Sequence, residues 1–191
     1  MHSIDETLCL GKDDDGDTAL TLASQHGSKE TVKYLINDLK VDIHQKGAFG
    51  RNCFLSAASG GKIETMKYLH SVDDTLFLEK DDYGDTALTL ASEQGSKESS
   101  EYLISDLNVE IHQKGAYGRN CFLTAASGGK IDTMKYLHSI DDTLSLEKDD
   151  QGSTALTLAC KFSSLKAVDY LINQFKVDIH ATGAQCGKTK K

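Results

Sequence analysis

The sequence predicts an all-α solenoid built from stacked helix–turn–helix pairs, and three observations lead to this prediction. The phrase TALTLAS begins at Thr18, returns at Thr86 and, with a different last residue, at Thr154, while a second phrase, NCFLSAAS or NCFLTAAS, begins at Asn52 and Asn120. These five starts lie 34 residues apart, within the range of periods that indicates a solenoid. Each unit also shows apolar spacing typical of amphipathic helices and ends in a glycine-containing turn.

The first helix of each unit is predicted to open at Thr18 or Asn52, because both residue types cap the free backbone N–H groups of a helix start. It carries ALTLAS or CFLSAA, in which small alanines allow a neighbouring helix to approach closely. We expect this helix to end at a residue whose backbone has the left-handed conformation. The glycines at that position are Gly27, Gly61, Gly95 and Gly129.

The second helix runs through SKETVKYLI or KIETMKYLH. Val32, Leu35 and Ile36 fall at helical spacing and predict one apolar stripe. In the third unit Ser99–Glu101 replaces Thr-Val-Lys, so Ser100 stands where the first unit has a core valine. The third unit is therefore predicted to be the least stable part of the array.

Each unit closes with a segment such as VDIHQKGAFGR or TLFLEKDDYGD, whose glycine predicts a turn between two extended arms. A single unit cannot bury its own apolar face, whereas a stack can. We expect one array over residues 1–191, which is either a piece of a longer protein or a minimal version of such an array. Its segments are the tail of a preceding repeat (1–12), five repeats (13–46, 47–80, 81–114, 115–148 and 149–182) and a basic tail (183–191).

The two phrases alternate along the chain because a block of two units was copied. Residues 2–69 and 70–137 are identical at 52 of 68 positions. Wherever odd-numbered units still differ, as at Asp15, Tyr83 and Gln151, the fold does not dictate the residue. Such positions are candidates for contact with a partner.

These units resemble the ankyrin repeat. The first unit carries Asp13, Gly16, Thr18, Leu20 and Ala23 of the family motif D-x-x-G-x-T-P-L-H-x-A, and GSKETVKYLI and VDIH match its later parts. Tetratricopeptide repeats share the 34-residue length but lack this glycine-tipped finger. The resemblance covers nearly the whole chain and implies a protein-binding scaffold without catalysis.

The chain departs from the family motif at three points. Alanine or cysteine replaces the proline, threonine or leucine replaces the histidine, and the period is 34 instead of 33. The hydrogen bonds that the family's histidine makes must therefore be replaced or absent.

A net charge of −8 and an isoelectric point near 5.3 disfavour a nucleic-acid or anionic-membrane binder, which needs a basic face. The longest apolar runs are far shorter than a membrane span, and the first residues lack the pattern of a signal peptide. The five cysteines include no C-x-x-C pair. We therefore expect a cytoplasmic monomer with reduced thiols.

Catalysis and metal binding are not expected. Cys53 and Cys121 stand at a helix start, where the dipole favours thiolate, and His44 and His112 lie nine residues earlier. A nucleophile copied every 68 residues with no converging third group would make a poor enzyme. The histidines recur at positions too far apart to share an ion, and KDDDGD lacks the spacing of a calcium loop. We predict no cofactor and no metal.

The resemblance implies a partner-binding surface on the concave side, formed by the finger tips and the start of the loop after each first helix. Odd fingers are acidic and even fingers are basic and aromatic. Neighbouring fingers could pair with each other, or their aromatic side chains could anchor a partner protein. The alternative function is a passive structural spacer within a larger protein. The predicted partner-binding residues are Asp14, Asp15, Asp17, Gln25, His26, Phe49, Arg51, Asp82, Tyr83, Asp85, Glu93, Gln94, Tyr117, Arg119, Gln151, Lys161 and Phe162.

Overall fold

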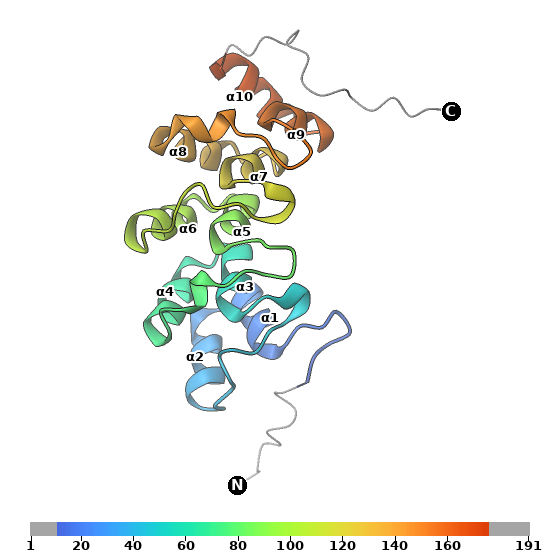
Figure 1. Ribbon diagram of the computed structural model, residues 1–191. Coiled ribbons are helices and arrows are strands. Elements are labelled where there is room, and N and C mark those ends of the chain that lie inside the picture. The colour runs from blue at the N-terminus through green and yellow to red at the C-terminus, as the bar shows by residue number, and fades with distance from the viewer. Residues whose placement is uncertain (1–10, 176–191) are drawn as a thin grey trace, which may run out of the picture.

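The computed structural model describes residues 11–175, and within this range the chain is a column of stacked helix pairs (Figure 1). The predicted all-α solenoid is confirmed. Most of the expected leading tail (1–12), the end of the fifth repeat and the basic tail (183–191) lie outside the described residues. The pairs are α1 (Ala19–His26) with α2 (Lys29–Asn37), α3 (Cys53–Ser59) with α4 (Ile63–Val72), α5 (Ala87–Gln94) with α6 (Lys97–Glu101), α7 (Cys121–Ser127) with α8 (Ile131–Ile140), and α9 (Ala155–Lys161) with α10 (Leu165–Phe175).

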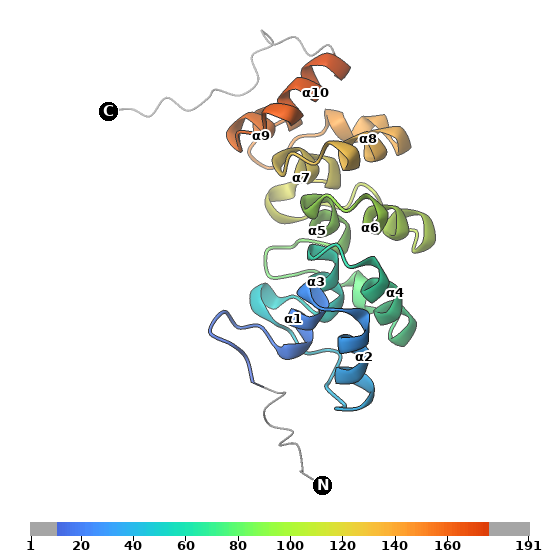
Figure 2. The same ribbon diagram turned by 180° about the vertical axis from the view of Figure 1, so that it is seen from behind.

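The helices form two layers, and Figure 2 shows the same arrangement from behind. The inner layer consists of α1, α3, α5, α7 and α9, each packed on the next. Along this layer leucine alternates with phenylalanine at one repeat position: Leu20, Phe54, Leu88 and Phe122 are at most 1 % exposed. Burial of each such side chain stabilises the fold by about 1.5–3 kcal/mol. The junctions between inner helices therefore contribute strongly to the stability of the fold.

The predicted helix starts are confirmed. Thr18 caps α1 by accepting a hydrogen bond from the Thr21 backbone N–H, and the Thr21 hydroxyl in turn accepts from the Thr18 N–H. The same box recurs in the other odd units. In this way threonine takes over local hydrogen bonding at the position of the family's histidine. Asn52 caps α3 and also donates from Nδ2 to the Leu76 carbonyl, which ties the helix start to the end of its own unit.

The glycine breaks follow the prediction at three of four positions. Gly61, Gly95 and Gly129 have φ values between 65° and 83°. Gly27 instead has φ −81° and ψ −163°, so a left-handed residue was the wrong expectation there. Space accounts for glycine at this position, because a Cβ would lie 2.6 Å from the Ala23 carbonyl oxygen. In the fifth unit Ser163 takes the same place with φ 57°.

The third unit has the shortest second helix of the described pairs. Helix α6 ends at Glu101 and continues as one π-helical turn, Tyr102–Asp106. Ser100 is fully buried, as its sequence position indicates, and its hydroxyl donates to the Ser96 carbonyl 3.0 Å away. The equivalent side chains in the first, second and fourth units are Val32, Met66 and Met134, all fully buried. Ser100 thus fills a core position with less apolar surface than its counterparts.

We expect Ser100→Val to raise the free energy of unfolding by about 1 kcal/mol, because it adds apolar surface at a buried site without removing the backbone hydrogen bond from residue 100 to Ser96. Chemical denaturation measures the change. Glu110→Val, which adds apolar surface at an exposed position of the same unit, is the control and should leave stability unchanged. A loss of stability at position 100 would show that the site has no room for the larger side chain.

A histidine joins the third unit to the fourth. His112 Nδ1 lies 2.8 Å from Glu147 Oε1, and its Nε2 lies 3.0 Å from Asp141 Oδ2. These hydrogen bonds, to Glu147 first and to Asp141 second, raise the pKa of His112 above its ordinary value. Both ring nitrogens donate only in the imidazolium form, so the contact is strongest when His112 is charged. The corresponding His44 makes one such contact, to Asp73 at 3.3 Å.

Because the folded state raises the pKa of His112, this contact stabilises the protein fully below the unfolded pKa and is lost as the pH rises through the folded pKa. We expect His112→Gln to lower the free energy of unfolding at about pH 5.5, by no more than about 1 kcal/mol for this partly exposed group, and to have little effect at about pH 9. His44→Gln, which removes the histidine with one carboxylate contact at the same repeat position, is the matched control for the loss of a histidine side chain. Equal effects of His112→Gln at both pH values would contradict the assignment.

Candidate functional site

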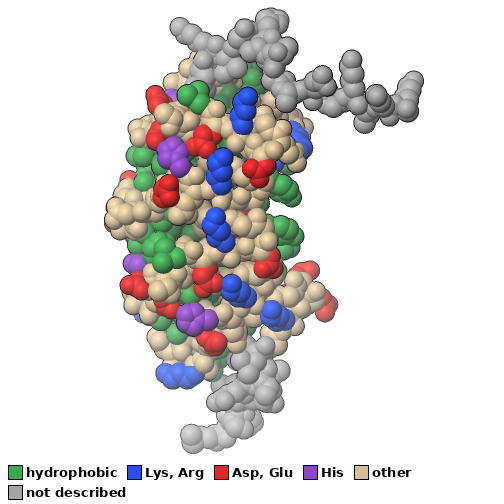
Figure 3. Space-filling model, viewed as in Figure 1, with side chains coloured by type: hydrophobic (Ala, Val, Ile, Leu, Met, Phe, Trp, Pro, Cys, Tyr) green, Lys and Arg blue, Asp and Glu red, His purple; other side chains and the backbone are tan. Residues whose placement is uncertain are grey.

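The candidate site lies on the finger edge, which we define as the five turns at residues 13–17, 47–51, 81–85, 115–119 and 149–153. These turns project from one side of the stack, at the right in Figure 1. Hydrophobic and acidic side chains protrude along the same edge in Figure 3.

Each odd finger is folded by its first aspartate. Asp81 Oδ1 accepts hydrogen bonds from the backbone N–H groups of Tyr83 and Asp85, at 3.0 and 2.9 Å. Asp13 and Asp149 do the same in their own fingers. The finger shape therefore comes from a local side-chain-to-backbone turn, which leaves the tip residue free to vary.

Each even finger is folded by its backbone. Phe49 and Tyr117 hold left-handed conformations, with φ 58° and 59°, and each is followed by a glycine with positive φ. For a bulky side chain such a conformation costs about 1–3 kcal/mol and persists only where the surroundings enforce it. The hydrogen bond from Gly47 N–H to the Arg51 carbonyl closes the turn around Phe49. Both aromatic rings therefore stand at the tips.

An aspartate links each odd finger to the even finger that follows. Asp17 Oδ1 accepts from the Thr21 hydroxyl at 2.9 Å and from the Ala48 backbone N–H at 3.0 Å, across 31 residues of sequence. Asp85 makes the same two contacts, with the Thr89 hydroxyl and the Ala116 N–H. One carboxylate oxygen thereby ties a helix start to the next finger.

Different contacts link each even finger to the next odd one. The Asp82 backbone N–H donates to the Phe49 carbonyl at 2.8 Å. Arg51 Nε donates to Asp81 Oδ2 at 3.0 Å, and the Asp81 carboxylate is fully buried. In the second block Arg119 Nε lies 3.5 Å from Asp149 Oδ2, an ion pair without hydrogen-bond geometry. The acidic and basic fingers thus pair with each other, one of the two interpretations of their alternating charge.

The arginines also stack on the aromatic tips. The Arg51 guanidinium lies 5.3 Å from the Phe49 ring centroid, and the Phe49 and Tyr83 rings are 5.7 Å apart. The Arg119 guanidinium lies 5.1 Å from the Tyr117 ring and 5.6 Å from the Phe162 ring. Such cation–π contacts hold the rings in place, while Phe49, Tyr83, Tyr117 and Phe162 remain 50–60 % exposed.

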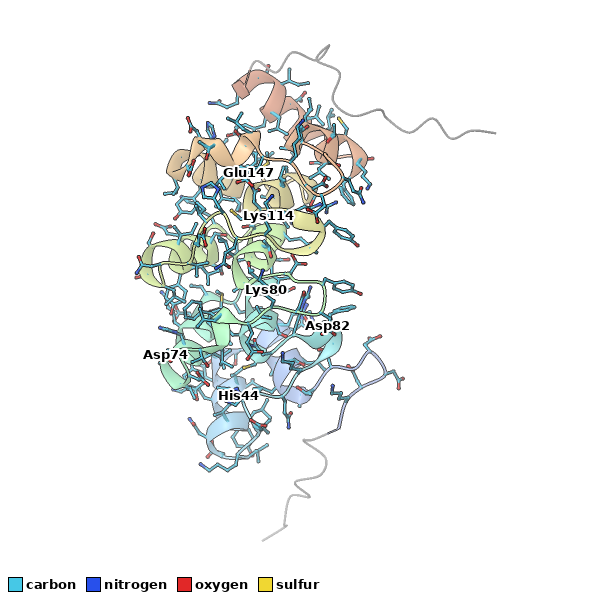
Figure 4. The ribbon with its side chains drawn as sticks, in the orientation of Figure 1. His44, Asp74, Lys80, Asp82, Lys114 and Glu147 are labelled. Carbon is cyan, nitrogen blue, oxygen red and sulfur yellow. The ribbon has the colours of Figure 1, made fainter. Side chains whose placement is uncertain are left out.

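The structure divides the predicted partner-binding residues into two groups. The first group is engaged inside the stack and consists of Asp17, Arg51, Asp85 and Arg119. The second is exposed, apart from the half-buried Gln25, and consists of Asp14, Asp15, Gln25, His26, Phe49, Asp82, Tyr83, Glu93, Gln94, Tyr117, Gln151, Lys161 and Phe162. Figure 4 shows Asp82 on the finger edge.

The duplicated cysteines are not placed for nucleophilic chemistry. Cys53 and Cys121 are fully buried, and their thiols donate to the Ile43 and Ile111 carbonyls at 3.4 Å. Burial raises the pKa of each thiol to about 12, which outweighs the effect of the helix start. Within residues 11–175 no cluster of three or more His, Cys, Asp or Glu side chains is placed to hold a metal ion. In the same part of the chain, no helix has the length and apolar character needed to cross a bilayer.

Sequence reasoning missed one feature beside the fingers. A lysine stands immediately before every finger, and all five are exposed. The signal was present as a constant residue at the 34-residue period. The lysines are Lys12, Lys46, Lys80, Lys114 and Lys148.

Comparison with known proteins agrees with this architecture. The family model for three copies of the ankyrin repeat matches residues 38–114 and 104–182, and the model for a single ankyrin repeat matches residues 15–48. No curated protein matches the chain. A solved complex of a predatory endopeptidase from Bdellovibrio bacteriovorus with an immunity protein contains a similar chain, with TM-score 0.64 and 23 % identity over 86 % of this chain and 82 % of that one. At this identity the likeness concerns the fold alone.

We expect Asp85→Ala to lower the free energy of unfolding by about 1–3 kcal/mol, because the Ala116 N–H and the Thr89 hydroxyl lose their shared acceptor. Asp82→Ala removes the same charge from the exposed neighbouring tip and should change stability by no more than about 0.5 kcal/mol. Thermal and urea denaturation of the two variants provide the comparison. Equal effects would mean that the clamp does not stabilise the stack.

Proposed function

The chain belongs to the ankyrin repeat family, and on this premise we propose that it is a non-catalytic scaffold that binds a partner protein through the finger edge. Ankyrin repeats are in general modules of protein–protein interaction. The observation that carries the proposal is the set of exposed aromatic tips, Phe49, Tyr83 and Tyr117, held by contacts that continue into the stack.

Exposed aromatic rings supply interface energy efficiently. A phenylalanine or tyrosine side chain buries roughly 150–250 Å² when covered, and such residues dominate measured interfaces. Here both flanks of each even finger are hydrogen-bonded to neighbouring fingers. A partner would therefore find the rings already positioned, and little side-chain entropy would be lost on binding.

The exposed acidic tips complement the aromatic ones. Asp14, Asp15 and Asp82 make the odd fingers anionic, whereas the arginines of the even fingers are partly neutralised by their aspartate partners. This pattern favours a partner surface that offers apolar pockets next to basic groups. We propose that the chain acts as a monomer in the cytoplasm, without cofactor, nucleic acid or membrane as ligand.

The alternative is a passive spacer, and the near-identity of the two 68-residue blocks favours it. A spacer needs only constant length and curvature, which copied blocks provide. It does not need exposed rings in strained backbone conformations at the tips. The aromatic tips therefore favour binding.

We expect the triple variant Phe49→Ala, Tyr83→Ala, Tyr117→Ala to lose a protein that the native chain captures from a lysate of its source cells. Each truncated anchor should weaken binding by about 1 kcal/mol or more, so three together reduce retention at least about a hundredfold. Quantitative mass spectrometry of the retained proteins measures the loss.

A second triple variant, Val72→Ala, Leu78→Ala, Ile140→Ala, removes as many exposed apolar side chains away from the fingers and should retain the partner. All three proteins must first give the same helical circular dichroism. Retention by the finger variant would move the binding surface elsewhere on the chain. Capture of nothing by the native chain would favour the spacer.

A further inference from the structure

The lysine row, which we define as Lys12, Lys46, Lys80, Lys114 and Lys148, runs along the stack between the fingers and the outer helices. Figure 3 shows Lys and Arg side chains in a line up the visible face, and Figure 4 places Lys80 and Lys114 on the same face, between the fingers and the outer helices. All five are exposed. The row lies beside the finger tips and is distinct from them.

Comparison of the five units with one another shows that this lysine is one of the few residues that do not change. When each unit is counted from its lysine, only five positions carry the same residue throughout, namely lysine, glycine, alanine, tyrosine and leucine. The glycine has positive φ in every finger. The alanine and the leucine pack in the core, and the tyrosine ring lies under a lysine of the preceding unit in four units. Four of the five constant residues therefore have a structural reason.

The remaining constant residue is the lysine, which has no common structural partner among the described residues. Lys46 pairs with Glu79 at 2.9 Å, and Lys114 lies 3.8 Å from Glu147. Lys80 donates instead to the Lys114 carbonyl. The glutamate partners of Lys46 and Lys114 are replaced by glutamine at the corresponding positions for Lys12 and Lys80. These glutamines are Gln45 and Gln113.

Ion pairing inside the stack therefore does not account for a lysine in every unit. Exposed pairs of this kind also stabilise a protein only weakly. A constant, exposed, positively charged residue without a common internal role indicates an external ligand.

The spacing of the row defines the shape of that ligand. Packed helices lie about 8–10 Å apart, so the row presents one positive charge about every 10 Å. In a β-strand, residues three apart point to opposite faces. A polyproline II helix has three residues per turn and rises about 3.1 Å per residue, so every third side chain returns to the same face after about 9.3 Å.

We propose that the lysine row binds an acidic polyproline II segment of a partner protein, with a carboxylate at every third residue. Such a segment places one carboxylate against each lysine. The exposed Asp14, Asp82 and Asp150 lie two residues beyond Lys12, Lys80 and Lys148 and repel a continuous polyanion such as a nucleic acid. Carboxylates separated by uncharged residues avoid most of this repulsion. The surface is additional to the finger edge and shares with it only the premise that the chain binds proteins.

The test uses a fluorescein-labelled peptide, (Glu-Pro-Pro)5, and fluorescence anisotropy at low ionic strength with the full chain. We expect the native chain to bind the peptide, and the variant with all five row lysines changed to glutamine to bind it at least about tenfold more weakly. The variant with all five changed to arginine keeps the charges and should keep the affinity.

The matched control changes five exposed lysines of the second helices to glutamine and has the same net charge as the row variant. These lysines are Lys33, Lys67, Lys97, Lys135 and Lys166. The control should keep the affinity of the native chain. A peptide of the same composition with its five glutamates in one block should bind more weakly than (Glu-Pro-Pro)5.

Several outcomes would overturn the proposal. They are no binding of (Glu-Pro-Pro)5, equal losses in the row variant and the control, equal affinity for the block peptide, or tighter binding of a single-stranded oligonucleotide. If the Phe49→Ala, Tyr83→Ala, Tyr117→Ala variant no longer binds the peptide while the row variant still does, the peptide binds on the finger edge. That last result would leave the proposed function intact while removing the row from it.

Discussion

The packing of each inner helix between its two neighbours is the constraint on which the rest of this structure depends. An isolated unit exposes both sides of its inner helix, so its apolar side chains are buried only when a unit sits on each side. Leu20, Phe54, Leu88 and Phe122 meet this requirement by alternating a smaller and a larger side chain along the column. Odd and even units therefore form two kinds of junction, and the smallest repeating element is the pair.

The fingers carry this alternation to the surface. One junction uses a carboxylate, from Asp17 or Asp85, to hold the N–H of the following finger. The other uses a backbone hydrogen bond and an arginine–aspartate pair, as between Arg51 and Asp81. Because every finger is tied to its neighbours, the aromatic tips and the lysine row keep the register of the helices beneath them. A ligand that spans several units thus meets an ordered surface.

We predict that the third unit supports this order least. Ser100 fills its core position with little apolar surface, and the outer helix ends in a π-helical turn. The contacts of His112 with Glu147 and Asp141 join this unit to the fourth. Local opening is easiest where few apolar contacts are lost. Protonation of His112 therefore stabilises the junction between the third and fourth units. Both proposed binding surfaces, the finger edge and the lysine row, cross this junction.

The sequence alone determined the period, the helix starts, the all-α architecture and the burial of Ser100, because caps and apolar spacing act within about four residues of the chain. The tertiary structure decided which charged residues are available. Asp82 and Asp85 are both acidic residues of one finger, yet Asp85 clamps the Ala116 N–H of the next finger, 31 residues away, and Asp82 is exposed. Contacts between units also buried the Cys53 thiol and lined up the five lysines. Such roles depend on neighbours that only the stack brings together.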